Sequence, residues 1–119
     1  MKKTVVIGAS DNPNRYAYKA VINLQKYNFP VVPLGIKKGE INGLEILHGK
    51  PLITEVDTIT LYISAKHQPE YYDYFLSLQP KRIIFNPGTE NPELYVLAKA
   101  KGIEVLNACT LVLLSVGDY

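Results

Sequence analysis

A short loop near the start of the chain combines residue types that can hold a phosphate group. Val5, Val6 and Ile7 favour a buried strand, and the run Gly8-Ala9-Ser10 follows them at once. Glycine permits a tight turn and a close backbone approach to a ligand, and a helix that begins after the loop directs unpaired N–H groups at an anion. Residues 4–20 are therefore predicted to form a strand, a phosphate loop and a helix, which suits a nucleotide pyrophosphate.

The loop differs from the G-x-G-x-x-G signature of NAD-binding proteins. Ser10 and Pro13 stand at the second and third glycine positions, and the apolar run 31–35 ends without the Asp or Glu that would bind the ribose. Ordinary NAD binding is thus disfavoured. On the loop alone, a plain strand-to-helix turn is an equally good interpretation, since every doubly wound fold needs one whether or not it holds a ligand.

Length and composition limit the classes of protein to consider. The 119 residues predict one domain, and 47% apolar and 20% charged residues are ordinary for a globular protein. A net charge of +2 provides no basic field for nucleic acid, and the early interruption of the first apolar run by Gly8 argues against a signal peptide or membrane span, so we expect a cytoplasmic protein. One cysteine and two histidines predict neither a disulfide nor a metal site.

Apolar runs and helical patterns alternate along the chain. Strands are expected at 4–7, 30–34, 58–64, 82–85 and 103–106, with a short one at 44–47, and helices at 14–27, 70–78 and 91–101. This alternation predicts one doubly wound α/β domain with a mainly parallel five-stranded sheet and helices on both faces. A ligand would then lie at the carboxyl ends of the strands, near segments 8–16, 33–38, 63–67, 86–89 and 107–110.

Four segments together resemble the CoA-binding domain family, small Rossmann-like proteins similar to the CoA-binding domain of succinyl-CoA synthetase. They read IGASDNPNRYAYKA, VVPLGIKKGEINGLEI, FNPGTENPEL and ACTLV, and they span nearly the whole chain. The most specific part is the G-A-S loop followed by Pro13, Arg15 and Tyr18. The resemblance implies a Rossmann-like domain over residues 1–119 that binds coenzyme A or an acyl-CoA.

The resemblance also implies a ligand site built around the first loop. The loop would face the CoA phosphates, Arg15 would pair with a phosphate, and Lys37 and Lys38 would meet the ribose 3′-phosphate, although solvated surface cations are the alternative for all three. The positions implied to contact the ligand are Gly8, Ala9, Ser10, Asn14, Arg15, Tyr16, Pro33, Lys37, Ile63, Ser64, Ala65, Asn86, Pro87, Gly88 and Cys109.

Two positions need separate comment. Gly35 and Ile36 replace the Asn-Pro pair that the family usually has, which predicts weaker contacts at the adenosine end. Cys109 follows Asn107, a possible helix N-cap, so it is expected in the first turn of a closing helix, where the dipole lowers a thiol pKa. A small buried hydrophobe is the favoured interpretation of Cys109, and a mixed disulfide with CoA is the alternative.

The sequence therefore predicts a non-catalytic module with a small-molecule nucleotide ligand as its partner. Neither nucleic acid nor a membrane is expected as a partner, while the apolar stretch 111–116 leaves a homodimer open. No nucleophile pair or metal set is recognisable, so no catalytic residue is predicted. The alternatives are a small enzyme or ligase-like subunit acting on a CoA thioester, and a protein-interaction domain that has lost its ligand.

Overall fold

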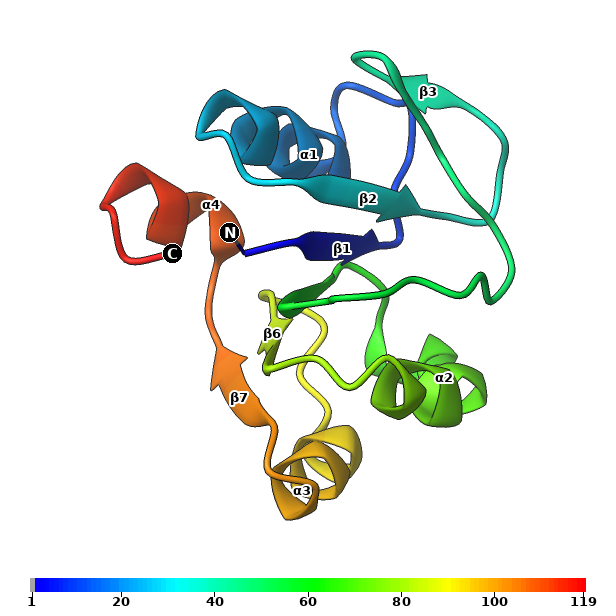
Figure 1. Ribbon diagram of the computed structural model, residues 1–119, viewed down its shortest axis with the longest axis vertical. Coiled ribbons are helices and arrows are strands. Elements are labelled where there is room, and N and C mark those ends of the chain that lie inside the picture. The colour runs from blue at the N-terminus through cyan, green and yellow to red at the C-terminus, as the bar shows by residue number, and fades with distance from the viewer. Residues whose placement is uncertain (1) are drawn as a thin grey trace.

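A five-stranded parallel sheet forms the centre of the computed structural model, which describes residues 2–119. The sheet order is β2-β1-β5-β6-β7, and helices cover both of its faces (Figure 1). The strands are β1 (Thr4–Ile7), β2 (Val31–Leu34), β5 (Thr58–Leu61), β6 (Arg82–Phe85) and β7 (Glu104–Asn107). The arrangement confirms the predicted doubly wound α/β fold.

The sheet separates two apolar cores because side chains alternate between its faces. Val5 and Ile7 of β1 point into the core under α2 (Tyr72–Ser77) and α3 (Pro92–Ala100), whereas Val6 points into the core under α1 (Tyr16–Lys26) and α4 (Thr110–Ser115). All four residues of each of β1, β5 and β6 are buried. Strands covered on both faces favour apolar residues throughout, as in most of β1, whereas β5 and β6 also bury Thr58, Thr60 and Arg82.

The order of the strands fixes where a ligand can bind. From β1 the chain crosses to β2 on one side, and it then returns past β1 to β5 on the other side. The loops after β1 and β5 therefore diverge, and in sheets of this kind the crevice between them holds the ligand. The first loop of the chain lies at this switch point.

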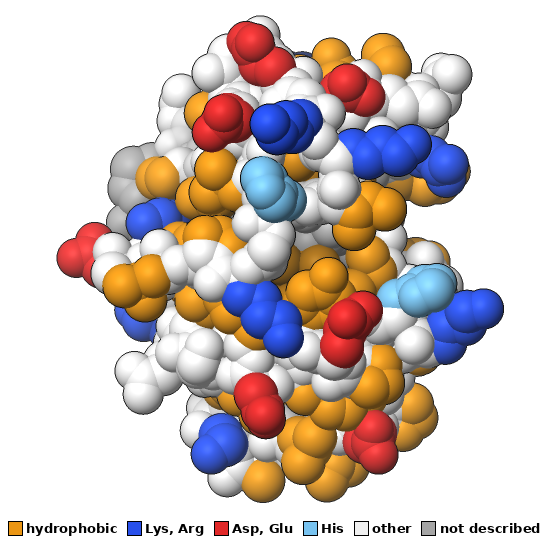
Figure 2. All heavy atoms as spheres, turned by 90° about the vertical axis from the view of Figure 1, so that its right-hand side faces the viewer, with side chains coloured by type: hydrophobic (Ala, Val, Ile, Leu, Met, Phe, Trp, Pro, Cys, Tyr) orange, Lys and Arg blue, Asp and Glu red, His pale blue; other side chains and the backbone are white. Residues whose placement is uncertain are grey.

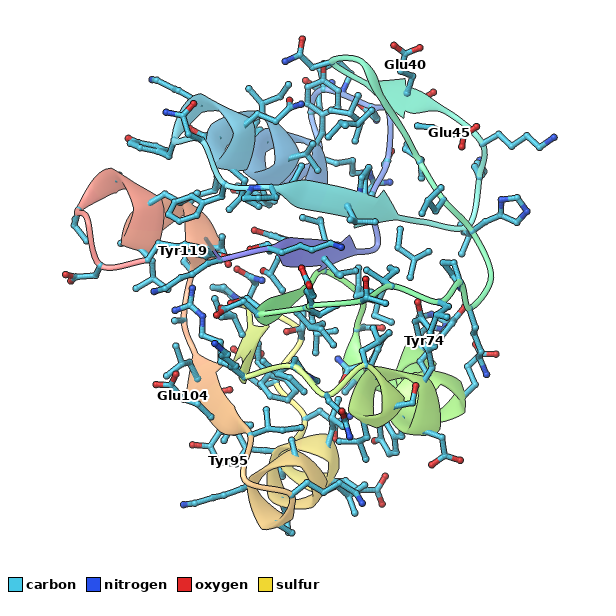
Figure 3. All side chains as sticks on the ribbon, viewed as in Figure 1. Glu40, Glu45, Tyr74, Tyr95, Glu104 and Tyr119 are labelled. Carbon is cyan, nitrogen blue, oxygen red and sulfur yellow. The ribbon has the colours of Figure 1, made fainter. Side chains whose placement is uncertain are left out.

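The segment between β2 and β5 folds differently from the expectation of a single short strand. It forms a small hairpin of β3 (Glu40–Ile41) and β4 (Leu44–Glu45), shown by the labelled Glu40 and Glu45 in Figure 3. Asn42 and Gly43 take the positive φ angles, 46° and 88°, that a tight hairpin turn requires. Leu47 then bridges to Leu34 and covers the outer edge of β2.

The other helices and strands begin and end at the predicted residues or within a few residues of them. Asn28 has a φ of 66° just after α1, and Asn91 caps α3 by accepting hydrogen bonds from two backbone N–H groups. The third predicted strand ends at Leu61 rather than at 64. The helix expected at 70–78 is α2, preceded by the 3₁₀ turns η1 (Ala65–His67) and η2 (Pro69–Tyr71).

The amino edge of the sheet is closed by Tyr119, the last residue of the sequence (Figure 3). Its hydroxyl forms a hydrogen bond with Thr4, and its ring packs edge-on against Phe29. The guanidinium of Arg82, only 7% exposed, lies 4.3 Å from the centre of the Tyr119 ring and donates through Nε to Thr58 Oγ1 at 2.7 Å. The ring therefore shields a buried cation from water.

The loops at the carboxyl edge are packed against one another. Gly35 follows β2, and a Cβ atom at this position would overlap the carbonyl oxygen of Ala9 in the loop after β1. Only a residue without a side chain permits this approach, because the obstacle is backbone and has no rotamer to change. The loops after β1 and β2 thus form one surface.

Gly35→Ala is expected to lower the free energy of unfolding by about 1–3 kcal/mol, the usual cost of forcing extra atoms into a packed site. Gly39→Ala is the control, since φ is not positive there and a Cβ would meet the Asp11 side chain, 2.9 Å from Oδ2 and 3.2 Å from Cβ and Cγ, rather than backbone. Because the exposed Asp11 side chain can change rotamer, the control should lose less stability than Gly35→Ala. Urea unfolding of the three proteins measures both values, and equal losses would contradict the role of Gly35.

Candidate functional site

A hollow of about 470 Å³ opens at the carboxyl edge of the sheet, between the loops that follow β1, β2, β5 and β6. We call it the carboxyl-edge hollow. Figure 2 looks onto this edge, where apolar side chains lie between groups of Lys, Arg and His side chains. The hollow is lined by Gly8, Ala9, Ser10, Asp11, Arg15, Tyr16, Ala17, Ile36, Lys37, Lys38, Tyr62, Ile63, Ser64, Pro87, Gly88 and Thr89.

The structure brings most of the sequence-predicted contact residues together in this hollow. Those that line it are Gly8, Ala9, Ser10, Arg15, Tyr16, Lys37, Ile63, Ser64, Pro87 and Gly88. Lys38, expected beside the ribose 3′-phosphate, lines it as well. Five lining residues were not named as contacts, namely Asp11, Ala17, Ile36, Tyr62 and Thr89. Asp11, Ile36 and Thr89 lie within the segments predicted to be near the ligand, and Ala17 and Tyr62 each adjoin one of these segments.

The first loop presents its hydrogen-bond donors differently from the expectation. The N–H groups of Gly8 and Ala9 both donate to the carbonyl of Leu34, at 2.9 and 3.0 Å, so neither is free for a phosphate. Ser10 Oγ accepts a bond from the Asn12 N–H at 3.1 Å, which leaves the Ser10 O–H free to donate outward. The donors available to an anion therefore begin at Ser10.

The start of α1 supplies further donors. Arg15 occupies the N-cap position, where no side chain accepts a bond from the helix, and the first turn holds no acidic residue. The first N–H groups of a helix have no partner within the helix, and its dipole adds partial positive charge at this end. Tyr16 and Ala17 of this first turn line the hollow. The helix start is thus open to an anion.

Gly8 lets two of the loops around the hollow pack directly against each other. Its φ is +92°, and a Cβ atom there would lie 2.9 Å from Ile63 Cγ2 and 3.1 Å from the carbonyl of Tyr62. Both the backbone angle and the contact require glycine. The loops after β1 and β5 consequently touch at the switch point of the sheet.

The rim of the hollow is mainly basic. Arg15, Lys37 and Lys38 are exposed and line it, against one carboxylate, that of Asp11. Arginine can donate two parallel bonds to a phosphate, whereas lysine acts as a point charge. Apolar side chains at Tyr16 and Ile36 complete the rim, each more than half exposed. The hollow can therefore hold an anionic group beside an apolar one.

Tyr62 adds a buried hydroxyl behind the hollow. The hydroxyl has no hydrogen-bond partner, although the hydroxyls of Thr60 and Thr110, which bond to each other at 2.8 Å, lie close to it. Burial raises the pKa of Tyr62 well above its usual range, and the nearness of the Thr110 hydroxyl offsets only part of this. Tyr62 is consequently neutral at every physiological pH.

Five of the predicted contact residues do not line the hollow. Asn86 is 2% exposed and ties three elements together, since its amide donates to Thr60 Oγ1 at 2.6 Å and to the Leu61 carbonyl at 2.9 Å, and its Oδ1 accepts from the Thr110 N–H at 2.8 Å. Pro33 is buried inside β2. The remaining three are Asn14, exposed before α1, Ala65 in η1, and Cys109.

Cys109 is half-buried and occupies the N-cap position of α4 without accepting a hydrogen bond from the helix. Asn107, expected as the N-cap, is instead the last residue of β7. The predicted start of this helix was therefore wrong by two residues.

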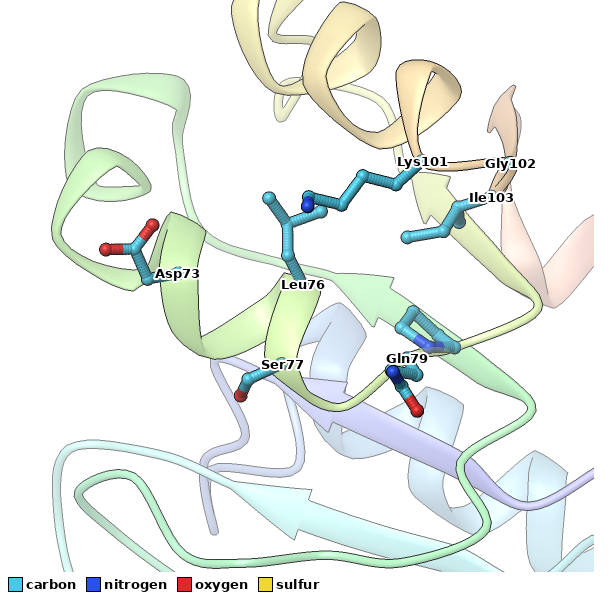
Figure 4. A pocket seen from close by; sticks show the side chains of 8 residues that line it. Asp73, Leu76, Ser77, Gln79, Lys101, Gly102 and Ile103 are labelled. Carbon is cyan, nitrogen blue, oxygen red and sulfur yellow. The ribbon is translucent and has the colours of Figure 1, made fainter.

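A second hollow, of about 620 Å³, lies between the ends of α2 and α3 (Figure 4). Asp73, Ser77 and Lys101 line it together with Gln79 and Gly102. Although larger, it opens at the amino ends of β6 and β7, away from the switch point where ligands of such sheets bind. The loops after β1 and β5, which diverge at the switch point, contribute nothing to its lining, so we regard the carboxyl-edge hollow as the functional site.

Residues 2–119 contain neither a metal-binding cluster nor a membrane-spanning helix. No group of three or more His, Cys, Asp or Glu side chains is placed to hold a metal ion in this range. In the same residues, no helix has both the length and the apolar composition needed to cross a membrane.

Comparisons with known proteins agree on a family and a fold. The sequence profile described as CoA binding domain matches residues 2–115. An uncharacterized protein of solved structure is 50% identical, with a TM-score of 0.98 over 100% of this chain and 98% of its own. No curated protein has a matching sequence.

More distant structures share the fold alone. A Thermus thermophilus protein is 23% identical, with a TM-score of 0.87 over 99% of this chain and 90% of its own. The dinucleotide-forming acetyl-coenzyme A synthetase 1 of Candidatus Korarchaeum cryptofilum, solved with phosphate and ADP, is 21% identical, with a TM-score of 0.72 over 90% of this chain and 25% of its own.

Tyr62→Phe is expected to flatten the loss of stability at high pH. The pKa of Tyr62 is raised in the folded protein, whereas in the unfolded chain the phenol loses its proton near pH 10. Tyr62 therefore contributes its full stabilisation of the folded state below about pH 10, and this stabilisation is lost as the pH rises further. Above that pH the wild-type free energy of unfolding should fall more steeply, by up to about 1.4 kcal/mol per pH unit. Urea unfolding between pH 7 and 11.5 tests this, and parallel curves for the two proteins would contradict it.

Proposed function

Because this chain belongs to the CoA-binding domain family, we propose that it is a single domain, over residues 1–119, that binds coenzyme A or an acyl-CoA in the carboxyl-edge hollow. The observation that carries the proposal is the uncapped start of α1, which opens into the hollow beside Arg15. A helix start of this kind is a ready-made phosphate site.

The proposed arrangement places the pyrophosphate at the start of α1. The Ser10 hydroxyl and the free N–H groups of the first helical turn would donate to it, and the Arg15 guanidinium would neutralise it. Lys37 and Lys38 would face the ribose 3′-phosphate. The loops at 63–64 and 87–89 would form the opposite wall, with Gly8 allowing the ligand to approach the sheet.

We propose binding without catalysis. The described residues that line the hollow include no histidine and no cysteine, and the Ser10 hydroxyl is bonded to the Asn12 N–H rather than to the Asp11 carboxylate. Binding alone requires complementary charge and shape, which the lining supplies. If the protein instead turned over a CoA thioester, it would be a catalytic subunit.

Calorimetric titration of nucleotide-free protein with CoA, ADP and NAD tests the proposal. Tighter binding of CoA than of ADP or NAD supports it, since only CoA carries both the pyrophosphate and the 3′-phosphate. Absence of heat and of any thermal shift with CoA would overturn it. Steady hydrolysis of acetyl-CoA in the same preparation would support a catalytic role instead.

Arg15→Ala is expected to weaken CoA binding by about 1.5–3 kcal/mol, or roughly 10- to 150-fold, because a charge-assisted hydrogen bond is lost. Lys26→Ala is the matched control, since Lys26 is an exposed cation in the last turn of the same helix. The control should bind CoA as the wild type does. Equal affinity of Arg15→Ala and wild type in calorimetry would remove Arg15 from the site.

The double substitution Lys37→Ala/Lys38→Ala is expected to weaken CoA binding several-fold, with exposed charge pairs each worth about 0.2–1 kcal/mol. Dephospho-CoA, which lacks the 3′-phosphate, should bind the variant and the wild type equally. The ratio of the CoA affinity to the dephospho-CoA affinity, compared between variant and wild type, therefore measures the 3′-phosphate contact alone. A parallel loss for both ligands would place these lysines elsewhere along the ligand.

A further inference from the structure

A completely buried amide joins two walls of the carboxyl-edge hollow. Gln68 lies between η1 and η2 and is 0% exposed. Its Nε2 donates to the carbonyl of Ile63 at 3.0 Å and to the carbonyl of Thr89 at 2.8 Å. Ile63 belongs to the loop after β5 and Thr89 to the loop after β6, and both residues line the hollow. Both N–H groups of one amide thus hold two separate loops.

The acceptor side of the same amide connects to two helices. Gln68 Oε1 accepts a bond from Asn91 Nδ2 at 2.8 Å, and Asn91 Nδ2 also donates to the Tyr72 hydroxyl at 2.8 Å. Asn91 Oδ1 caps α3 by accepting from the N–H groups of Glu93 and Leu94. The position of Gln68 is therefore fixed by α2 and α3, which pack on the sheet.

A polar group this deeply buried is retained only when its hydrogen bonds are made, and a fully satisfied network is rigid. Loops at the end of a sheet are otherwise the most mobile part of a domain. The loops at 63–64 and 87–89 thus have a restraint that the exposed rim at 36–38 lacks within the described part of the chain. The hollow has one fixed wall and one open rim.

We infer that Gln68 is a positioning residue, which holds Ile63–Ser64 and Pro87–Thr89 in the arrangement that receives the ligand. Gln68 itself does not line the hollow, so it acts through these loops. Fixing a wall in advance lowers the entropy lost on binding. The affinity part of this inference rests on the proposed function, with coenzyme A as the ligand, whereas the effect on the loops is independent of any ligand.

The restraint extends to the phosphate loop. Gly8 lies against Ile63, and Ala9 lies against Gly35, so the loops after β2, β1 and β5 are in contact in that order. Gln68 adds the loop after β6 to this series. A change at Gln68 therefore reaches the phosphate-binding loop through the Ile63–Gly8 contact.

Gln68→Met tests the inference, because it keeps the volume of the side chain and removes all three hydrogen bonds. Tyr74→Phe is the control, since it removes the bond from the buried Tyr74 hydroxyl to the Pro51 carbonyl, 2.6 Å long, outside the hollow. Thermal melts establish a temperature at which all proteins are folded. We expect CoA affinity to fall about tenfold or more in Gln68→Met and to stay unchanged in Tyr74→Phe.

A double-mutant cycle separates positioning from a general loss of stability. Ser64→Ala should weaken binding in the wild type and have a smaller effect in Gln68→Met, because the loop that presents Ser64 is then already displaced. Additive losses would contradict a role through this loop. If Gln68→Met does not fold, Asn91→Asp serves, since it keeps the α3 cap but removes the donor to Gln68 Oε1.

Amide hydrogen exchange supplies a readout without ligand. Exchange in segments 62–68 and 86–91 should be faster in Gln68→Met and unchanged in Tyr74→Phe. Faster exchange with no CoA binding by the wild type would contradict the proposed function and support the fixing of the loops. Wild-type CoA affinity and exchange in a folded Gln68→Met protein would overturn the inference while leaving the proposed function intact.

Discussion

The close approach of neighbouring loops at the carboxyl edge is the constraint on which the rest of this site depends. Parallel strands lie about 4.8 Å apart, so the loops that leave them must share very little space. Gly8 and Gly35 meet this requirement by presenting bare backbone to the next loop. The same contact consumes the Gly8 and Ala9 N–H groups on the Leu34 carbonyl, and it moves the free donors to Ser10 and the start of α1.

The carboxyl edge and the start of α1 differ in whether their polar groups have hydrogen-bond partners within the protein. At the carboxyl edge Asn86 and Gln68 satisfy backbone carbonyls and hydroxyls from several segments, and this interior is closed. At the start of α1 the backbone donors have no protein partner. An unsatisfied helix start is costly to keep in a dry interior and inexpensive beside water, where an anion can replace the solvent.

The sequence predicts the sheet, the two helix layers and the position of the hollow, because each follows from local patterns. Apolar runs at β1 and β6 and the Asn91-Pro92 helix start need no long-range information. The partners of Gln68 are different, since its amide reaches Thr89 and Asn91, more than twenty residues away along the chain. The capture of the Gly8 N–H by Leu34 is likewise a pairing between strands, which spacing along one segment does not reveal.

Tyr119 gives the amino edge a property that concerns the handling of the protein. Its ring lies over the guanidinium of Arg82, and Lys2 donates to its backbone carbonyl at 2.5 Å, so the two ends of the described chain meet there. Any change that displaces the Tyr119 ring would therefore expose a buried cation to water and free Lys2 at the same time. Heterogeneity in melting temperature would then arise at this edge, while the opposite edge, with its hollow, kept its shape.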